Sequence, residues 1–166
     1  MGARRPVIGV MGARKPSPSQ RAAARRLGRL IAEAGWILLT GGRPAGVMDA
    51  ATAGAKEIPG SLTLGILPCG PGDAVSPHVD VAVFTGMGDA RDAINVLSSD
   101  VVVACGVEGP GTAAEVALAL NAGRPTILLG APDAVLDFYR PLDSNHHLHQ
   151  AATPDAVVEL IHKLLR

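Results

Sequence analysis

The residues best suited to chemistry in this sequence surround a glycine-rich turn. The short β-branched run Val101–Ala104 is typical of a strand that is buried on both faces. Gly106, Gly109 and Gly111 follow this run, and a helix is predicted to begin at about Thr112. Glycines let backbone N–H groups approach a ligand closely, and a helix N-terminus favours negative charge. The order of strand, glycine turn and helix therefore predicts a phosphate-binding site.

Glu115 lies close to the start of this predicted helix. Thr112 and Glu115 have the Thr-x-x-Glu spacing of a capping box, in which each side chain satisfies a backbone donor at the helix start. The same carboxylate could instead act in catalysis or bind a hydroxyl group. The two roles can hold together, so the residues alone leave both open.

A second glycine loop of the same kind occurs earlier in the chain. The apolar run Trp36–Thr40 leads into Gly41–Met48, and a helical pattern continues from about Gly46 to Glu57. Each loop ends a strand and opens a helix. We therefore expect both loops at the carboxyl edge of one parallel sheet, where open α/β sheets bind ligands.

Several basic residues are predicted to lie near the same edge. Arg91 follows another glycine loop at a helix start, where a cation is unfavourable to the helix dipole. That mismatch suggests that its guanidinium forks onto a phosphate or carboxylate of a ligand. The alternative is a surface arginine paired with Asp89 or Asp92. Arg14, Lys15 and Arg43 are expected in loops at the ligand edge, and each could equally be an ordinary solvated charge.

The elements that must position these residues alternate along the chain. Strands are predicted at residues 6–11, 36–40, 62–67, 79–85, 101–104, 125–129 and 146–151. Helices are predicted from residue 17 or 19 to 34, at 46–57 and 89–98, from about 112, and at 133–139 and 154–165. Strand–helix alternation with short connections predicts an α/β fold, a doubly wound and mostly parallel sheet with helices on both faces. We expect one domain over residues 1–166.

Composition limits the class of protein. The chain has 166 residues, of which 48% are hydrophobic and 18% charged, so a sizeable core is expected and disorder is not. No apolar run approaches the length of a membrane span, and we expect no signal peptide because a strand pattern begins almost at residue 1. Eight basic residues precede the first acid, Glu33. They form either a solvated helix face or a positive rim that steers an anion, whereas nucleic acid is a poorer partner because no aromatic residues are interleaved.

The cysteines and histidines offer weaker candidates. Cys69 and Cys105 fit no metal spacing, and two reduced thiols predict a cytoplasmic protein. A thiolate ligand at Cys105 is conceivable, but a buried, inert thiol is the simpler interpretation. His147 and His149 could share one strand face and bind a metal. No carboxylate or cysteine completes a ligand set with them, which favours surface or interface histidines.

The two glycine motifs also carry a family resemblance. Gly41-Gly42-x-x-x-Gly46-Val47-Met48 and Gly109-Pro110-Gly111-Thr112-x-x-Glu115 resemble the paired signature of the lysine decarboxylase-like superfamily, which includes the cytokinin-activating phosphoribohydrolases. Within it, the chain is most similar to the molybdenum cofactor carrier proteins. The similar stretches cover most of residues 6–130 and read PVIGVMG, GWILLTGGRPAGVMDAATAGAKE, TGMGDARDAINVLSSDVVVACGV and GPGTAAEVALALNAGRPTILLG.

This resemblance implies a function as well as a Rossmann-like fold. It implies a homotetramer that binds molybdenum cofactor, protects it and hands it on without catalysis. The expected partners are molybdenum enzymes or cofactor-synthesis proteins that donate or accept the cofactor. The positions expected to contact the cofactor are Gly12, Arg14, Lys15, Gly41, Gly42, Arg43, Gly46, Val47, Met48, Arg91, Asn95, Gly109, Pro110, Gly111, Thr112 and Glu115.

The resemblance leaves an enzyme as the alternative. In the phosphoribohydrolases, which act on nucleoside 5'-monophosphates, an arginine before the central strand and a glutamate after the glycine loop form the catalytic pair. Arg91 and Glu115 hold those positions in this chain. Two departures favour the carrier: Glu108-Gly-Pro-Gly replaces the usual Pro-Gly-Gly-x-Gly, and the Arg-Lys pair of the enzymes reads Arg91-Asp92.

Overall fold

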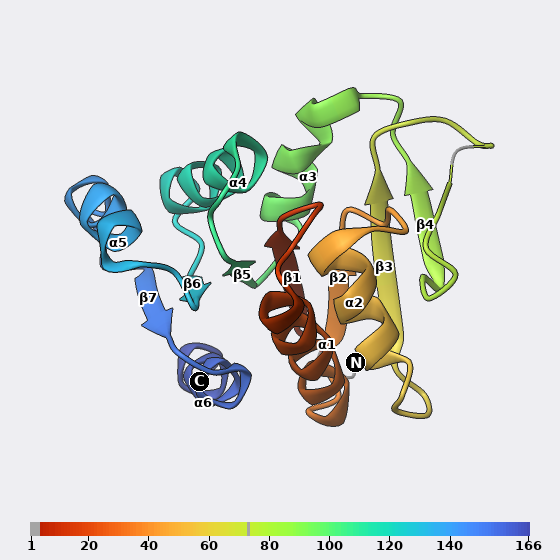
Figure 1. The fold of residues 1–166 in the computed structure, drawn as a ribbon, viewed down its shortest axis with the longest axis horizontal. Coiled ribbons are helices and arrows are strands. Elements are labelled where there is room, and N and C mark those ends of the chain that lie inside the picture. Colours follow the sequence, from red (N-terminus) through yellow and green to blue (C-terminus); the bar gives the residue numbers. More distant parts are fainter. Residues whose placement is uncertain (1–3, 73) are drawn as a thin grey trace.

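The computed structural model describes residues 4–72 and 74–166. In this part of the chain seven parallel strands form one sheet in the order β4-β3-β2-β1-β5-β6-β7 (Figure 1). The strands are β1 (Val7–Gly12), β2 (Ile37–Thr40), β3 (Leu62–Leu67), β4 (Val81–Phe84), β5 (Val101–Cys105), β6 (Thr126–Leu129) and β7 (Leu148–Ala151).

Helices cover both faces of this sheet, which confirms the predicted Rossmann-like α/β fold. None of the helices in the described residues is long and apolar enough to cross a membrane. The helices are α1 (Pro18–Glu33), α2 (Gly46–Ala55), α3 (Asp92–Leu97), α4 (Pro110–Asn121), α5 (Asp133–Tyr139) and α6 (Pro154–Leu164), with short 3-10 turns η1 (Gly88–Arg91) and η2 (Arg140–Leu142).

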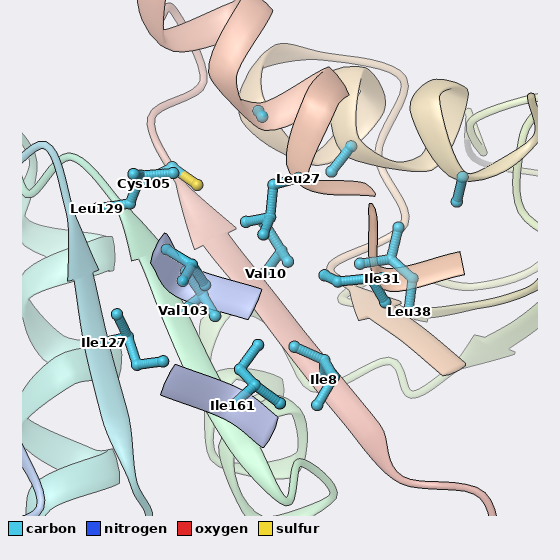
Figure 2. Packing of buried hydrophobic residues seen from close by; sticks show 14 of the residues in the cluster. Ile8, Val10, Leu27, Ile31, Leu38, Val103, Cys105, Ile127, Leu129 and Ile161 are labelled. Carbon is cyan, nitrogen blue, oxygen red and sulfur yellow. The ribbon is translucent and has the colours of Figure 1, made fainter. Parts of the chain in front are cut away.

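The central strands are apolar on both faces because each face is covered. Val103 and Cys105 of β5 pack with Leu27 of α1 and Ile161 of α6 in one cluster (Figure 2). Val102, which points to the opposite face, belongs to a second cluster. Burying one such side chain stabilises the fold by about 1.5–3 kcal/mol. The β-branched run predicted at Val101–Ala104 therefore contributes strongly to the stability of the core.

The strand order reverses beside β1. β1 pairs with β2 on one side and with β5 on the other, and Gly12 is opposite Cys105 in the register. The chain therefore leaves β1 toward the β4 edge and returns to place β5 beside β1. The connections that follow β1 and β5 leave their carboxyl ends in different directions, and a crevice opens between them.

The predicted capping box at Thr112 and Glu115 is wrong. α4 begins earlier, at Pro110, with Gly109 as its N-cap, and no side chain caps the helix. Proline suits the first helical position because its φ angle is preset and it has no N–H to satisfy. Thr112 and Glu115 therefore lie inside the helix, and both are buried.

The remaining boundaries differ little from the sequence predictions. Ser17 caps α1 and forms a capping box with Gln20. The predicted helix at 89–98 is divided, because its first turn adopts the tighter geometry of η1 before α3 begins. On the basic face of α1, exposed arginines pair with acids, among them Arg26 with Asp155 and Arg29 with Glu33. These pairs support the interpretation of this face as a solvated surface.

Candidate functional site

A cavity of about 530 Å³ lies at the carboxyl ends of β1 and β5. It is bounded by the loops after β1 and β2, by η1 and the start of α3, and by the first turns of α4. Of the positions proposed from the sequence, the structure brings these together around it: Gly12, Arg14, Arg43, Met48, Arg91, Gly109, Pro110, Gly111, Thr112 and Glu115.

Other proposed positions do not line the cavity, and several of them shape its walls. A Cβ at Gly41 would lie 2.7 Å from Sδ of Met48 and 2.9 Å from Nη2 of Arg91, so a larger residue would force these side chains to move. Gly46 has a φ of +71°, and a Cβ there would lie 2.3 Å from the carbonyl oxygen of Ala13. The next residue, Val47, donates its backbone N–H to the same oxygen at 3.1 Å. The positions outside the lining are Lys15, Gly41, Gly42, Gly46, Val47 and Asn95.

The N-terminus of α4 has the features on which the predicted anion site depends. The first N–H groups of any helix have no partner within the helix, and here no side chain caps them. A Cβ at Gly109 or Gly111 would meet no protein atom within 4 Å, so a side chain at either position would occupy open space beside these N–H groups. Backbone donors and the helix dipole together favour a phosphate or carboxylate at this point.

Arg91 is the centre of a buried charge cluster in the cavity wall. Its residue is 5% exposed, and its Nη1 pairs with the carboxylate of Asp92. The same atom lies 3.8 Å from Oε1 of Glu115, which is also buried. One guanidinium thus faces two carboxylates, one from α3 and one from α4.

The environment of Glu115 changes its acidity. Burial, followed by the negative charge of Asp92, raises its pKa from 4.5 to about 7, against the opposing effect of Arg91. Burial also raises the pKa of Asp92, and Arg91 again opposes the change. At neutral pH the Glu115 carboxyl therefore exchanges between its neutral and ionised forms.

Sequence reasoning missed part of the lining. Asp89 and Asp92 entered only as possible ion-pair partners of Arg91, whereas both line the cavity themselves. Ala114 and Leu118 also line it, as does Ala13. The spacing of Gly111, Ala114 and Leu118 is that of one helix face, so the helical period of α4 could have identified them.

The thiols and histidines stand apart from this cluster. Cys105 is buried in the core, which raises its pKa to about 12 and makes it an inert thiol. Cys69 lines a neighbouring cavity of about 340 Å³, which shares Arg14 and Arg43 with the main one. Within residues 4–72 and 74–166 no group of three or more His, Cys, Asp or Glu residues is arranged to hold a metal.

Replacing Glu115 with glutamine tests the energetic cost of its burial. Because the folded pKa is raised, the folded protein holds a proton that the unfolded chain releases, and wild-type stability falls as the pH rises from about 4.5 to about 7. Glu115→Gln removes this loss while Asp92 still neutralises Arg91. We expect the variant to be more stable than wild type at pH 8 by on the order of 2–3 kcal/mol, and about equal at pH 4.

Urea unfolding at the two pH values measures this difference. The matched control is Glu33→Gln, an exposed glutamate of α1, which should change stability little at either pH. A Glu115→Gln variant that is less stable than wild type at pH 8 would show that the ionised carboxylate stabilises the fold.

Comparison with known proteins gives matches over almost the whole chain. The structure of the molybdenum cofactor binding protein from Rippkaea orientalis is 47% identical, covers 99% of this chain and 100% of its own, and superposes with a TM-score of 0.93. That of the molybdenum cofactor carrier protein from Chlamydomonas reinhardtii is 49% identical, covers 98% and 99%, and has a TM-score of 0.91. The resemblance inferred from the sequence is confirmed.

A relative without a described function and a family model complete the comparison. An uncharacterised protein of Archaeoglobus fulgidus is 41% identical over 125 residues, which are 75% of this chain and 80% of the relative. The model of the SLOG cluster4 family (LDcluster4) matches residues 5–158, which include every strand and the whole cavity lining. The chain is therefore a member of the SLOG cluster4 family.

Proposed function

We propose that this protein binds and carries molybdenum cofactor. The observation that carries the proposal is the match, at 47% and 49% identity over almost the whole chain, to structures of a protein that binds this cofactor and a protein that carries it. Molybdenum cofactor is a pterin with a dithiolene-bound molybdenum and a terminal phosphate. A cavity of about 530 Å³ is within the range that small ligands occupy.

The distribution of donors in the cavity suits the anionic parts of such a ligand. The uncapped N-terminus of α4 offers backbone N–H groups to the phosphate. Arg14 and Arg43 line the same cavity from the loops after β1 and β2, and their guanidinium groups complement further negative charge. Holding the cofactor through such contacts requires no bond to be broken.

The place of the carrier in the cell follows from its cargo. Proteins that make the cofactor are the proposed donors, and molybdenum enzymes are the proposed acceptors. Two free cysteines, one buried and one half-buried, support a reducing compartment, and we propose the cytoplasm.

Substituting a larger residue for one glycine at the start of α4 tests the proposed phosphate contact. In Gly111→Val the added side chain would occupy the open space beside the helix N-terminus, so we expect at least a 10-fold loss of retained molybdenum cofactor with the fold intact. The measurement is the pterin and molybdenum content of purified protein after incubation with the cofactor. Ala117→Val, on an exposed position of α4 outside the cavity, is the control. Equal retention by all three proteins would remove this loop from the site.

One observation favours the enzyme as a second candidate function. The Arg91 and Glu115 side chains, which hold the positions of the catalytic pair of the phosphoribohydrolases, approach to 3.8 Å between Nη1 and Oε1. Hydrolysis of a nucleoside 5'-monophosphate would use Glu115 to stabilise developing positive charge on the ribose or to activate water.

A base-release assay separates this candidate from the carrier. We expect wild type to release no free base from AMP, because a carrier holds its ligand without bond breaking. Were hydrolysis the function, Glu115→Ala would lower the rate by roughly 10²–10⁴-fold, the usual contribution of a general acid–base group. Base release that depends on Glu115, together with no retention of molybdenum cofactor, would replace the carrier with the enzyme.

At its β4 edge the sheet exposes apolar side chains, and we propose that a second copy of the chain covers them within a homotetramer. Val81 and Val83 of β4 are 47% and 40% exposed, and they are opposite Leu64 and Ile66 of β3 in the parallel register. Residues paired in this way share a face, on the side of the sheet where Leu97 of α3 is 56% exposed. Contiguous exposed apolar residues are typical of protein interfaces.

Light scattering tests the homotetramer. The wild-type particle is expected at about four times the chain mass of 16.9 kDa, and Val83→Asp is expected to form smaller particles because it places a charge in the interface. Leu165→Asp, at an exposed position after α6, should leave the mass unchanged. A monomeric wild type would contradict the proposal.

A further inference from the structure

The charged groups of the cavity are segregated. Arg14 is exposed and Arg43 is half-buried, whereas Arg91 and Glu115 are buried and Asp92 is nearly so. The outer part thus carries two guanidinium groups beside the single exposed carboxylate of Asp89, and the inner part carries two carboxylates for one guanidinium. A phosphate group is favoured at the outer part and at the start of α4, and the two carboxylates would repel it from the inner part.

Buried polar atoms without a hydrogen-bond partner among the described residues occur at the inner part, in the cavity wall at Arg91 and just outside the lining at Asn95. These are Nε of Arg91 and both the oxygen and the nitrogen of the Asn95 amide. Asn95 has no exposed surface, lies one helical turn after Arg91, and acts on the Glu115 carboxyl closely enough to lower its pKa. Buried polar groups are almost always paired in native proteins. The unpaired Nε of Arg91, whose side chain lines the cavity, indicates a place where a ligand completes the hydrogen bonding.

An acceptor carboxylate beside a guanidinium donor defines the complementary ligand. A carboxylate accepts two adjacent N–H donors with its two oxygens, and a guanidinium donates to a carbonyl oxygen. We infer that Glu115 and Arg91 recognise a 2-amino-4-oxopyrimidine edge, in which an exocyclic amine and a ring N–H stand next to a carbonyl. Glu115 accepts from the amine and the ring N–H, Arg91 donates to the carbonyl oxygen, and Asn95 is a positioning residue behind Glu115.

The inference rests on the proposed function and extends it. The pterin of molybdenum cofactor carries this edge at the end of the molecule opposite its phosphate, so the segregation of charge orients the cofactor with the pterin inward. Guanine carries the same edge. The two sources share one recognition chemistry and are distinguished by the rings attached to it.

Calorimetric measurement of binding tests this recognition with pairs of heterocycles that differ at one group. Lumazine has a carbonyl where pterin has the 2-amino group, and inosine monophosphate lacks the 2-amino group of guanosine monophosphate. We expect wild type at pH 8 to bind pterin at least roughly 10-fold more tightly than lumazine, as for a hydrogen bond to a charged group. Glu115→Gln places an amide N–H donor opposite the N–H donors of the ligand, so it should reduce this ratio to about unity. Asn95→Ala should reduce the ratio in part.

Arg43→Ala is the matched control. It should weaken retention of the phosphate-bearing cofactor and leave the ratio of pterin to lumazine unchanged, because Arg43 is not a member of the ion pairs that join Arg91 to Asp92 and Glu115. Discrimination of guanosine from inosine monophosphate without discrimination of pterin from lumazine would identify guanine as the source of the edge and would overturn the pterin orientation.

The outcomes separate this inference from the proposed function. If wild type retains molybdenum cofactor but binds pterin and lumazine equally, or Glu115→Gln preserves the ratio, the inference is overturned and the carrier stands. If wild type discriminates the heterocycles but retains no molybdenum cofactor, the recognition stands and the carrier is overturned.

Discussion

The pairing of β5 with β1 is the constraint on which the site depends. A parallel sheet needs a crossover for every strand, and this chain places β2, β3 and β4 on one side of β1 before β5 joins the other side. Because of that reversal, the loops after β1 and β5 diverge and leave a crevice between them. The apolar residues of β5 make the pairing stable, since both of its faces are buried in the core. Packing and site formation are therefore consequences of the same hydrogen-bonded ladder.

Close approach of backbone and side chains is the second requirement, and glycine meets it where no other residue can. The absence of a Cβ at Gly41 lets the guanidinium of Arg91 pass over the backbone. The left-handed conformation of Gly46 brings the start of α2 against the carbonyl oxygen of Ala13. Neither glycine lines the cavity. Both affect the positions of residues that do line it, so their contribution to the cavity is geometric.

Much of this architecture could be predicted from the sequence because it follows from local patterns. β3 begins and ends at the predicted residues, since a short apolar run between two turns admits few alternatives. The start of α4 was misassigned because a capping-box spacing competed with Pro110, and proline at the first helical position determined the outcome. The burial of Thr112 and Glu115 against neighbouring elements is consistent with their place inside the helix.

The cluster around Arg91 was less accessible to sequence reasoning. The pattern indicated that Arg91 had a use at the ligand edge, and it offered Asp92 only as a surface partner. The contact with Glu115 depends on how α3 and α4 pack, which no spacing within one helix reveals. The burial of Asn95 likewise depends on the strands beneath α3, and its place among the expected contacts came from the family resemblance alone.

The shared wall between the two cavities has a thermodynamic consequence. Arg14 and Arg43 line both the main cavity and the smaller one that contains Cys69. An anion in the smaller cavity would neutralise the same guanidinium groups that attract an anion to the larger one. Occupancy of one cavity therefore opposes occupancy of the other even though the two ligands never touch, and linkage makes the opposition equal in both directions.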